Sequence, residues 1–261
     1  MDMDLNLIKN TGIGAAYKSA DIINSFSGKL TSVKKKGPID LVTEADLASE
    51  KNIIETIHSR FPEHEILAEE SGLNKTGDST CQWIVDPLDG TTNFAHQIPI
   101  FAVSIAFAVN NEIKVGIVLN PVSGELFTAV RGQGATLNGK KITVSKEKRL
   151  SESLLVTGFP YDVKQMMYPL MLRFKRCIAA SRGIRRLGSA ALDLCFVACG
   201  RFEGFWEENL KPWDTAAGWI IAEEAGARIT DFSGAPYTLD KKEILATNCH
   251  IHNELKLTLE I

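Results

Sequence analysis

The sequence predicts a mixed protein with an α+β first half and an α/β second half. Two helical segments come before a run of short apolar strands up to about residue 145. After residue 150, strand and helix patterns alternate along the chain. With 261 residues, 44% of them hydrophobic and 23% charged, the chain is long enough to bury a large core.

The elements of the first half follow from apolar periodicity and from helix breakers. Apolar residues spaced for one helix face predict a helix at 4–27. Three lysines followed by Gly37 and Pro38 predict a loop at 34–38. A second helix is expected to begin near Ala45 and to end before Pro62. Strands are expected at 66–68, 83–85, 101–109, 113–119 and 125–130, the last three as an antiparallel meander.

The second half alternates short apolar runs with longer helical patterns. Strands are expected at 154–158, 184–187, 202–206, 227–230 and 244–247. Helices are expected at 164–180, 189–199, 212–225 and 250–260. A polar segment at 146–149 places the boundary between an N-terminal half, 1–147, and a C-terminal half, 148–261. Because no long linker separates the halves, we expect one compact unit with a cleft between them.

Bulk properties exclude several classes of protein. A net charge of −3 and a pI near 6.0 argue against a nucleic-acid or membrane-surface binder driven by bulk charge. The first twenty residues lack the pattern of a signal peptide, and no apolar run is long enough to span a bilayer. The five cysteines are odd in number and form no Cys-x-x-Cys pair, so we expect reduced thiols in a cytoplasmic protein.

The most informative segment is 83–94, where an apolar strand leads into two acids and a glycine turn. Asp86 and Asp89 are three residues apart, and Gly90, Thr91 and Thr92 follow. Backbone N–H groups after the glycine can face an anion, as at the start of a helix. The two carboxylates can hold divalent cations beside that anion. The segment therefore predicts a site where metal ions and a phosphate meet.

Two further acidic positions strengthen this prediction. Glu69 and Glu70 follow the apolar run 66–68, and Asp214 falls in the first turn of a predicted helix. Each alone has a simple structural explanation, a solvated turn or a favourable interaction with the helix dipole. Together with the 83–94 segment they predict one acidic site. Oxygen ligands without His or Cys favour Mg²⁺ or Mn²⁺ over Zn²⁺.

These segments resemble the inositol monophosphatase family of metal-dependent sugar phosphatases. The resemblance also includes 40–46, 187–191 and 206–226, so it covers essentially the whole chain, and 131–135 with 210–214 are most similar to the bacterial branch. It implies a five-layer α-β-α-β-α sandwich, the sugar-phosphatase fold shared with fructose-1,6-bisphosphatase. It also implies hydrolysis of inositol-1-phosphate by metal-activated water, sensitivity to lithium and a homodimer.

The resemblance also implies roles for individual residues. Two or three Mg²⁺ ions, for which Mn²⁺ can substitute, would be the cofactor. The implied metal ligands are Glu69, Asp86, the carbonyl of Leu88, Asp89 and Asp214. The implied catalytic residues are Glu69 together with Thr91 and Asp46, which would orient the attacking water. Asp46 would also sit at a third, weaker metal site. Substrate contacts are implied for Gly90, Thr91, Ala190, Glu207 and Asp214, and the loop around Lys36 would close over the cleft.

Other motifs have simpler interpretations. The Cys-x₅-Arg spacing from Cys195 to Arg201 is better explained by a buried helix than by a cysteine-dependent phosphatase. His250 and His252 are too isolated for a metal site and fit a surface or helix-start position. Asp193 is assigned only a structural role. A basic strip is expected near the mouth of the cleft, where it could grip a second phosphate or cross a dimer interface; its members are Arg182, Arg185 and Arg186.

Several functions remain open at this point. The first choice is an inositol monophosphatase-type phosphoric monoester hydrolase that acts on a small sugar or polyol phosphate. Alternatives within enzymes are fructose-1,6-bisphosphatase or dual-specificity activity, and a nucleotide 3′-phosphatase. An alternative of another class is a non-catalytic regulatory or scaffold protein on the same fold. We expect neither direct nucleic-acid binding nor membrane binding.

Overall fold

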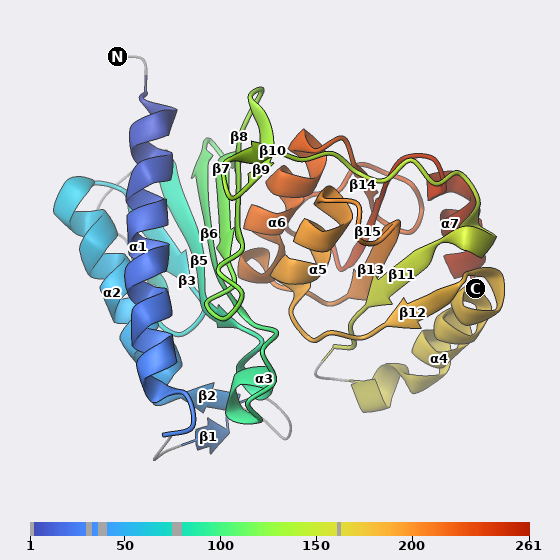
Figure 1. Ribbon diagram of the computed structural model, residues 1–261, viewed down its shortest axis with the longest axis horizontal. Coiled ribbons are helices and arrows are strands. Elements are labelled where there is room, and N and C mark those ends of the chain that lie inside the picture. Colours follow the sequence, from blue (N-terminus) through green and yellow to red (C-terminus); the bar gives the residue numbers. More distant parts are fainter. Residues whose placement is uncertain (1–2, 30–32, 36–40, 75–79, 161–162) are drawn as a thin grey trace.

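Five layers of secondary structure stack in the order helix, sheet, helix, sheet, helix (Figure 1). The computed structural model describes residues 3–29, 33–35, 41–74, 80–160 and 163–261. Two helices form the outer layer on the left of Figure 1, α1 (Leu5–Phe26) and α2 (Glu44–Arg60). The middle layer consists of α5 (Ala190–Ala198) and α6 (Pro212–Glu224). The last layer pairs α4 (Val163–Ala180) with α7 (His252–Leu259).

The larger sheet has eight strands in the order β10-β9-β8-β7-β6-β5-β3-β4. Its neighbouring strands are antiparallel except for β3 and β5, which run parallel. The turn between β6 and β7 uses Asn110 and Asn111, both with positive φ, which asparagine tolerates. The strands are β3 (Glu65–Ala68), β4 (Gly72–Asn74), β5 (Cys81–Asp89), β6 (Ala102–Val109), β7 (Glu112–Leu119), β8 (Leu126–Val130), β9 (Gly134–Leu137) and β10 (Lys140–Lys141).

The smaller sheet has five strands in the order β12-β11-β13-β15-β14. β11 runs parallel to both β12 and β13, whereas β15 runs antiparallel to β13 and β14. These strands are β11 (Leu154–Thr157), β12 (Gly183–Arg185), β13 (Gly204–Glu208), β14 (Arg228–Thr230) and β15 (Glu243–Thr247). The remaining elements are the hairpin of β1 (Val33–Lys35) and β2 (Leu41–Thr43), the short helix α3 (Thr91–Ala95) and a 3₁₀ turn, Leu150–Glu152.

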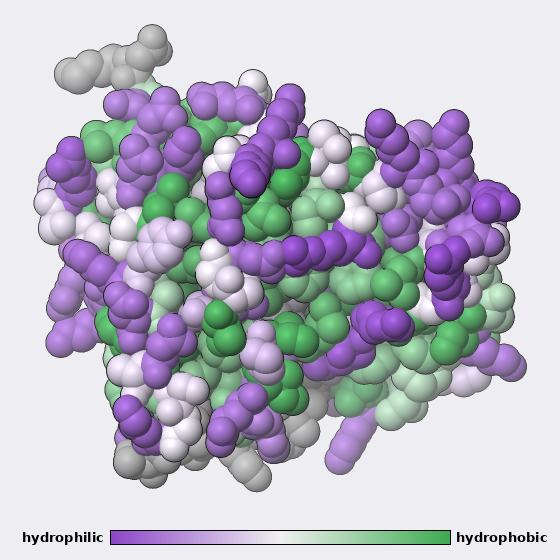
Figure 2. Space-filling view, in the orientation of Figure 1, coloured by the Kyte–Doolittle hydropathy of each residue, from purple (hydrophilic) through white to green (hydrophobic). Residues whose placement is uncertain are grey.

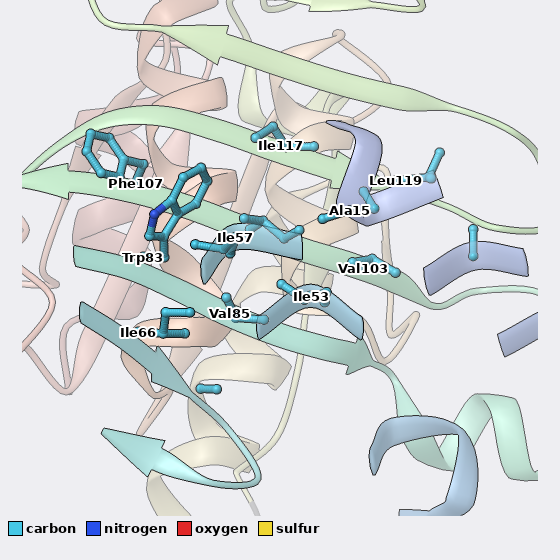
Figure 3. Packing of buried hydrophobic residues seen from close by; sticks show 14 of the residues in the cluster. Ala15, Ile53, Ile57, Ile66, Trp83, Val85, Val103, Phe107, Ile117 and Leu119 are labelled. Carbon is cyan, nitrogen blue, oxygen red and sulfur yellow. The ribbon is translucent and has the colours of Figure 1, made fainter. Parts of the chain in front are cut away.

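The core lies on both faces of the larger sheet. On one face, Ile53 and Ile57 of α2 point toward the strands, and Trp83 packs against Phe107 with ring centroids 5.1 Å apart (Figure 3). All four side chains are fully buried. On the other face, buried residues of α5 and α6 fill the space between the two sheets. Figure 2 shows a surface on which hydrophilic and apolar areas alternate, with apolar areas at the lower right over α4.

α6 approaches β7 closely because β7 carries a glycine at the contact. A Cβ atom at Gly116 would lie 2.5 Å from Cγ2 of Ile220 and 2.6 Å from the carbonyl oxygen of Ala217. Any larger residue would therefore push the middle layer away from the sheet. The position of α6 matters for the site, because Asp214 lies in its first turn.

Most of the predicted fold is confirmed, including the five layers and the buried setting of Cys195 in α5. All five cysteines are free. The expected loop at 34–38 is wrong for Lys34 and Lys35, which belong to β1, while the rest of it, with Lys36, lies outside the described residues. His252 begins α7 as expected, but it is buried rather than on the surface. No helix in the described ranges is long and apolar enough to cross a membrane.

We predict that Gly116→Ala lowers the free energy of unfolding by about 1–3 kcal/mol, because the added methyl group overpacks the contact between α6 and β7. Gly14→Ala is the control, since Gly14 is an exposed residue of α1 and no atom lies within 4 Å of the position that an added methyl group would take. That substitution should raise the free energy of unfolding by about 0.5–1 kcal/mol. Denaturant unfolding measures both values. Equal stability of the two variants would contradict the close approach of α6 to β7.

Candidate active site

A cleft of about 400 Å³ opens between the two sheets and contains almost all of the predicted site residues. This volume lies in the range of small-molecule sites. β5 and α3 supply one part of its wall, α5, β13 and the start of α6 supply another, and connecting segments such as 158–160 and 209–210 complete it. The predicted residues that line it are Glu69, Asp86, Leu88, Asp89, Gly90, Thr91, Ala190, Glu207 and Asp214. Asp46 is the one predicted site residue that does not border the cleft.

The junction of β5 and α3 presents its acids because the strand is interrupted there. Pro87 has no N–H group, and the pairing of β5 with β6 is irregular between Asp86 and Asp89. The N–H of Leu88 donates to Oδ1 of Asp86 at 2.9 Å, which fixes that carboxyl. Gly90 then turns the chain with a φ of 100°. A Cβ atom at Gly90 would lie 3.0 Å from the carbonyl oxygen of Ile100, so only glycine fits.

Asp89 joins the end of β5 to the start of α5. Its Oδ2 accepts a hydrogen bond from Oγ of Ser189 at 2.6 Å and another from the N–H of Ala191 at 2.8 Å. Asp214 is held in a similar way, because its Oδ2 accepts from the N–H of Lys211 at 2.6 Å. These bonds set the direction of both carboxyls before any ligand enters.

Thr91 and Asp46 meet although they are 45 residues apart. Oγ1 of Thr91 lies 2.8 Å from Oδ1 of Asp46 and 3.1 Å from the carbonyl oxygen of Leu88, so its proton can be donated to either. The other oxygen of Asp46 accepts from the backbone N–H of Thr43 at 2.8 Å. Thr91 borders the cleft, whereas Asp46 is fully buried behind it. The structure thus brings Thr91 and Asp46 together, and of the two only Thr91 borders the cleft.

The acids raise the pKa values of one another. Burial raises the pKa of Asp86 well above its usual value, and Glu69, Asp89 and Asp214 raise it further. Burial raises the pKa of Asp89 to about 6, against the hydrogen bonds from Ser189 and Ala191. Burial also raises the pKa of Asp214, and Asp89 and Glu69 add to this effect. A bound cation would relieve this accumulation of negative charge.

The donor chemistry of the cleft fits a hard cation. None of the described residues that line it is His or Cys, and carboxylate and carbonyl oxygens suit Mg²⁺ or Mn²⁺. Within the described ranges, no three His, Cys, Asp or Glu side chains already form a metal-binding group. The acids are instead anchored by their own local hydrogen bonds, as at Asp89 and Asp214.

Glu207 lies deep in the cleft on β13. Its carboxyl packs directly against Gly158, where a Cβ atom would collide with both of its oxygens. Burial raises the pKa of Glu207 to about 8, with a further upward contribution from Asp214 and an opposing one from Arg186. Glu207 is therefore a mostly protonated carboxyl at neutral pH when no cation is bound.

The basic strip contributes one residue to the cleft. Arg186 lines it, but Arg182 forms an ion pair with Glu152 and does not. The side chain of Arg185 is exposed and donates to the carbonyl oxygen of Ile184 at 3.0 Å. Of the three arginines of the expected basic strip, only Arg186 therefore lines the cleft.

Sequence reasoning missed three residues of the site. Ser189 holds Asp89, and its position at the N-cap of α5 was a signal for it. Asn93 donates from Nδ2 to the carbonyl oxygens of Ile100 at 2.7 Å and Leu187 at 2.8 Å, and thereby ties α3 to the segment before α5. Asp193 lines the cleft, although it was assigned only a structural role. Nothing in the local sequence of Asn93 or Asp193 indicates these positions.

Comparisons with known proteins agree with the geometry. The model of the inositol monophosphatase family matches residues 4–260. An inositol-1-monophosphatase of a Synechocystis species is 47% identical over 91% of this chain and 83% of the relative. Nus factor SuhB of Haemophilus influenzae is 41% identical over 96% of this chain and 95% of the relative. The crystal structure of extragenic suppressor protein suhB from Bartonella henselae superimposes with a TM-score of 0.94, at 41% identity, over 97% of this chain and 98% of that chain.

We predict that Glu207→Gln stabilises the metal-free protein at pH 8. Because the folded pKa of Glu207 is about 8 and its ordinary value is 4.5, the folded state keeps a proton that the unfolded state loses. This titration makes the wild-type protein lose stability as pH rises from 4.5 to 8, and the variant lacks this contribution. We expect a difference on the order of a few kcal/mol at pH 8, disappearing toward pH 4.5, in denaturant unfolding with EDTA.

The control for this experiment is Glu125→Gln, for which the opposite sign is expected. A hydrogen bond from Arg201 lowers the pKa of Glu125, so its charged form stabilises the fold at neutral pH. That variant should be less stable than the wild type at pH 8 and should approach it in acid. A Glu207 variant that lost stability at pH 8 would disprove the buried, protonated state of this carboxyl.

Proposed function

Because the chain belongs to the inositol monophosphatase family, we propose that it is a Mg²⁺-dependent phosphomonoester hydrolase that converts inositol-1-phosphate into inositol and phosphate. The observation that carries this proposal is the convergence of four acids on one cleft beside the turn at Gly90. These acids are Glu69, Asp86, Asp89 and Asp214. They come from three separate segments of the chain, and their hydrogen bonds leave all four on the lining of the same cleft.

Metal dependence is general in this family, and the oxygen donors of the cleft suit it. We assign two Mg²⁺ ions to Glu69, Asp86, the carbonyl of Leu88, Asp89 and Asp214, with Mn²⁺ as a substitute. A third, weaker ion would be held by Asp46 through water. When bound, the cations supply a water nucleophile at neutral pH and neutralise the charge of the phosphoryl group.

Thr91 orients the attacking water in this proposal. If its hydroxyl donates its proton to Asp46, the lone pairs of Oγ1 are left to accept a proton of the water. Asp46 is buried and held by Thr43, so it keeps the hydroxyl in one orientation and is a positioning residue. Glu69 borders the cleft and acts with them on the same water.

The ester is held by the turn and by the second half of the chain. The first N–H groups of α3, after Gly90, have no acceptor within the helix and can donate to phosphate oxygens. Ala190, at the start of α5, borders the same space. Glu207 and Asp214 face the alcohol part of the substrate, where a carboxyl can exchange hydrogen bonds with hydroxyl groups.

The rate acceleration that phosphate-ester hydrolysis requires supports a cation-assisted mechanism. Hydrolysis of phosphate monoesters requires acceleration by up to about 10²¹-fold. A general acid or base alone contributes only about 10²–10⁴-fold. Positioning and electrostatic stabilisation must supply the rest, which is consistent with a cleft of pre-oriented acids.

A second candidate is a regulatory or scaffold role. Relatives at 41–42% identity carry the name Nus factor SuhB, which does not describe a phosphatase. This name favours a function beyond hydrolysis, either instead of it or beside it. The complete set of acids favours hydrolysis, because a scaffold has no need of them. We further propose a cytoplasmic homodimer that is inhibited by lithium and binds no nucleic acid directly.

We predict that Asp89→Asn lowers kcat for inositol-1-phosphate by about a thousandfold or more, or roughly 4 kcal/mol of transition-state stabilisation. The change removes one carboxylate charge from the proposed cation site and keeps the shape of the side chain. Phosphate release measured with Mg²⁺ and after EDTA treatment tests the proposal, and the wild type should need Mg²⁺. Asp240→Asn, at an exposed acid outside the cleft, is the control and should leave kcat unchanged. Magnesium-independent release, or normal turnover by Asp89→Asn, would refute the proposed function.

We predict that Thr91→Ala lowers kcat by about 10²–10⁴-fold and changes KM little, because the hydroxyl acts on the water rather than on the ester. Thr91→Ser keeps the hydroxyl and should retain most of the activity. Steady-state kinetics at saturating Mg²⁺ separate the two constants. A change confined to KM would instead assign Thr91 to substrate binding.

A panel of esters decides the substrate. Fructose-1,6-bisphosphate, histidinol phosphate and 3′-phosphoadenosine 5′-phosphate represent the alternative activities. The highest kcat/KM in this panel identifies the alcohol that the cleft accepts best.

A further inference from the structure

Asp193 is a buried acid that the mechanism above does not use. It lies in the first turn of α5, has only 1% of its surface exposed and lines the cleft. Its Oδ1 has no hydrogen-bond partner among the described residues. Among the described residues, Nε2 of His58 is the only other buried polar side-chain atom without a hydrogen-bond partner. An unpaired buried acceptor destabilises a fold unless a ligand satisfies it.

A purely structural role does not account for this carboxyl. Ser189 already caps α5, since its Oγ accepts from the N–H of Leu192. Asp193 forms no ion pair with a described residue, although the charge of Arg186 acts on it.

Among the acids of the cleft, Glu207 acts most strongly on Asp193. Burial raises the pKa of Asp193; among the neighbouring groups Glu207 raises it most, followed by Asp89. By contrast, the acids that act on Asp86 are Glu69, Asp89 and Asp214. Both Asp193 and Glu207 border the cleft, one from α5 and the other from β13. The cleft therefore has a second pair of carboxyl groups, close to the cation of Arg186.

We propose that Asp193 is a specificity-determining residue that hydrogen-bonds a hydroxyl group of a polyol phosphate, beside the hydroxyl bound by Glu207. This inference rests on the proposed phosphatase function and deepens it. A polyol with hydroxyl groups on neighbouring carbons can offer one to each carboxyl. An ester without hydroxyl groups leaves Oδ1 of Asp193 unpaired, and a site built in this way discriminates against it.

The test compares two esters that share the phosphate and differ in the alcohol. Inositol-1-phosphate carries hydroxyl groups, and 4-nitrophenyl phosphate carries none. Asp193→Leu should lower kcat/KM for inositol-1-phosphate by about tenfold or more, mainly through KM. The same variant should change kcat/KM for 4-nitrophenyl phosphate by about twofold at most, because that ester makes no contact with the carboxyl. Its melting temperature should rise, since an unpaired buried carboxyl is removed, whereas a structural role predicts a fall.

Two further variants keep the result interpretable. Asp193→Asn keeps an acceptor oxygen and the shape of the side chain, so its selectivity between the esters should lie between those of the wild type and Asp193→Leu. It also provides the selectivity ratio if the leucine variant does not fold. Cys195→Ala is the control, because Cys195 lies on the same helix and is buried but does not line the cleft. It should affect both esters equally.

The outcomes separate this inference from the function on which it rests. If the wild type hydrolyses neither ester with Mg²⁺, the proposed function is wrong and the inference is overturned with it. If the wild type hydrolyses both and the Asp193 variants keep the wild-type ratio, the inference alone is overturned. An equal loss for both esters also overturns it and makes Asp193 a structural residue.

Discussion

The hydrogen bonds that Asp89 receives from the start of α5 are the contact on which the site depends. Asp89 ends β5 of the larger sheet, while Ser189 and Ala191 begin a helix of the middle layer. Asn93 makes a second connection across the same gap through the carbonyl oxygen of Leu187. Because of these bonds, acids from the first half of the chain and Glu207 and Asp214 from the second half border one cleft.

This arrangement is electrostatically unfavourable without a ligand. Burial and mutual repulsion raise the pKa values of Asp86, Asp89, Asp214 and Glu207 in the same direction. The surrounding fold must therefore be stable enough to keep them together. The aromatic and aliphatic core on the other face of the larger sheet, around Trp83 and Phe107, supplies that stability away from the charges.

The sequence was informative where local periodicity or a continuous motif set the structure. α1 and α2 follow from apolar spacing and breakers, and the acids of 83–94 follow from one uninterrupted segment. The short strands β9 and β10 were missed because they contain only four and two residues, too few for a period to show.

The remaining misses depend on contacts that no local pattern contains. The two ring nitrogens of the buried His252 form hydrogen bonds with the hydroxyls of Thr230 and Thr247. Thr230 ends β14 and Thr247 ends β15, so neither belongs to the helix that His252 begins. Asp193 borders the cleft only because of the way α5 is set against β13. Of the three arginines, Arg186 alone lines the cleft, and it directly follows the last residue of β12.

The burial of α6 between the two sheets has a consequence for how the protein can be divided. Its residues from Thr215 to Ala222 are buried apart from the partly exposed Trp219, and they touch strands from both halves of the chain. A fragment that ended before α6 would expose the apolar face of the larger sheet that α6 covers. A fragment that began after α6 would lack the helix that packs against the smaller sheet. We therefore expect that neither part folds when it is produced without the other.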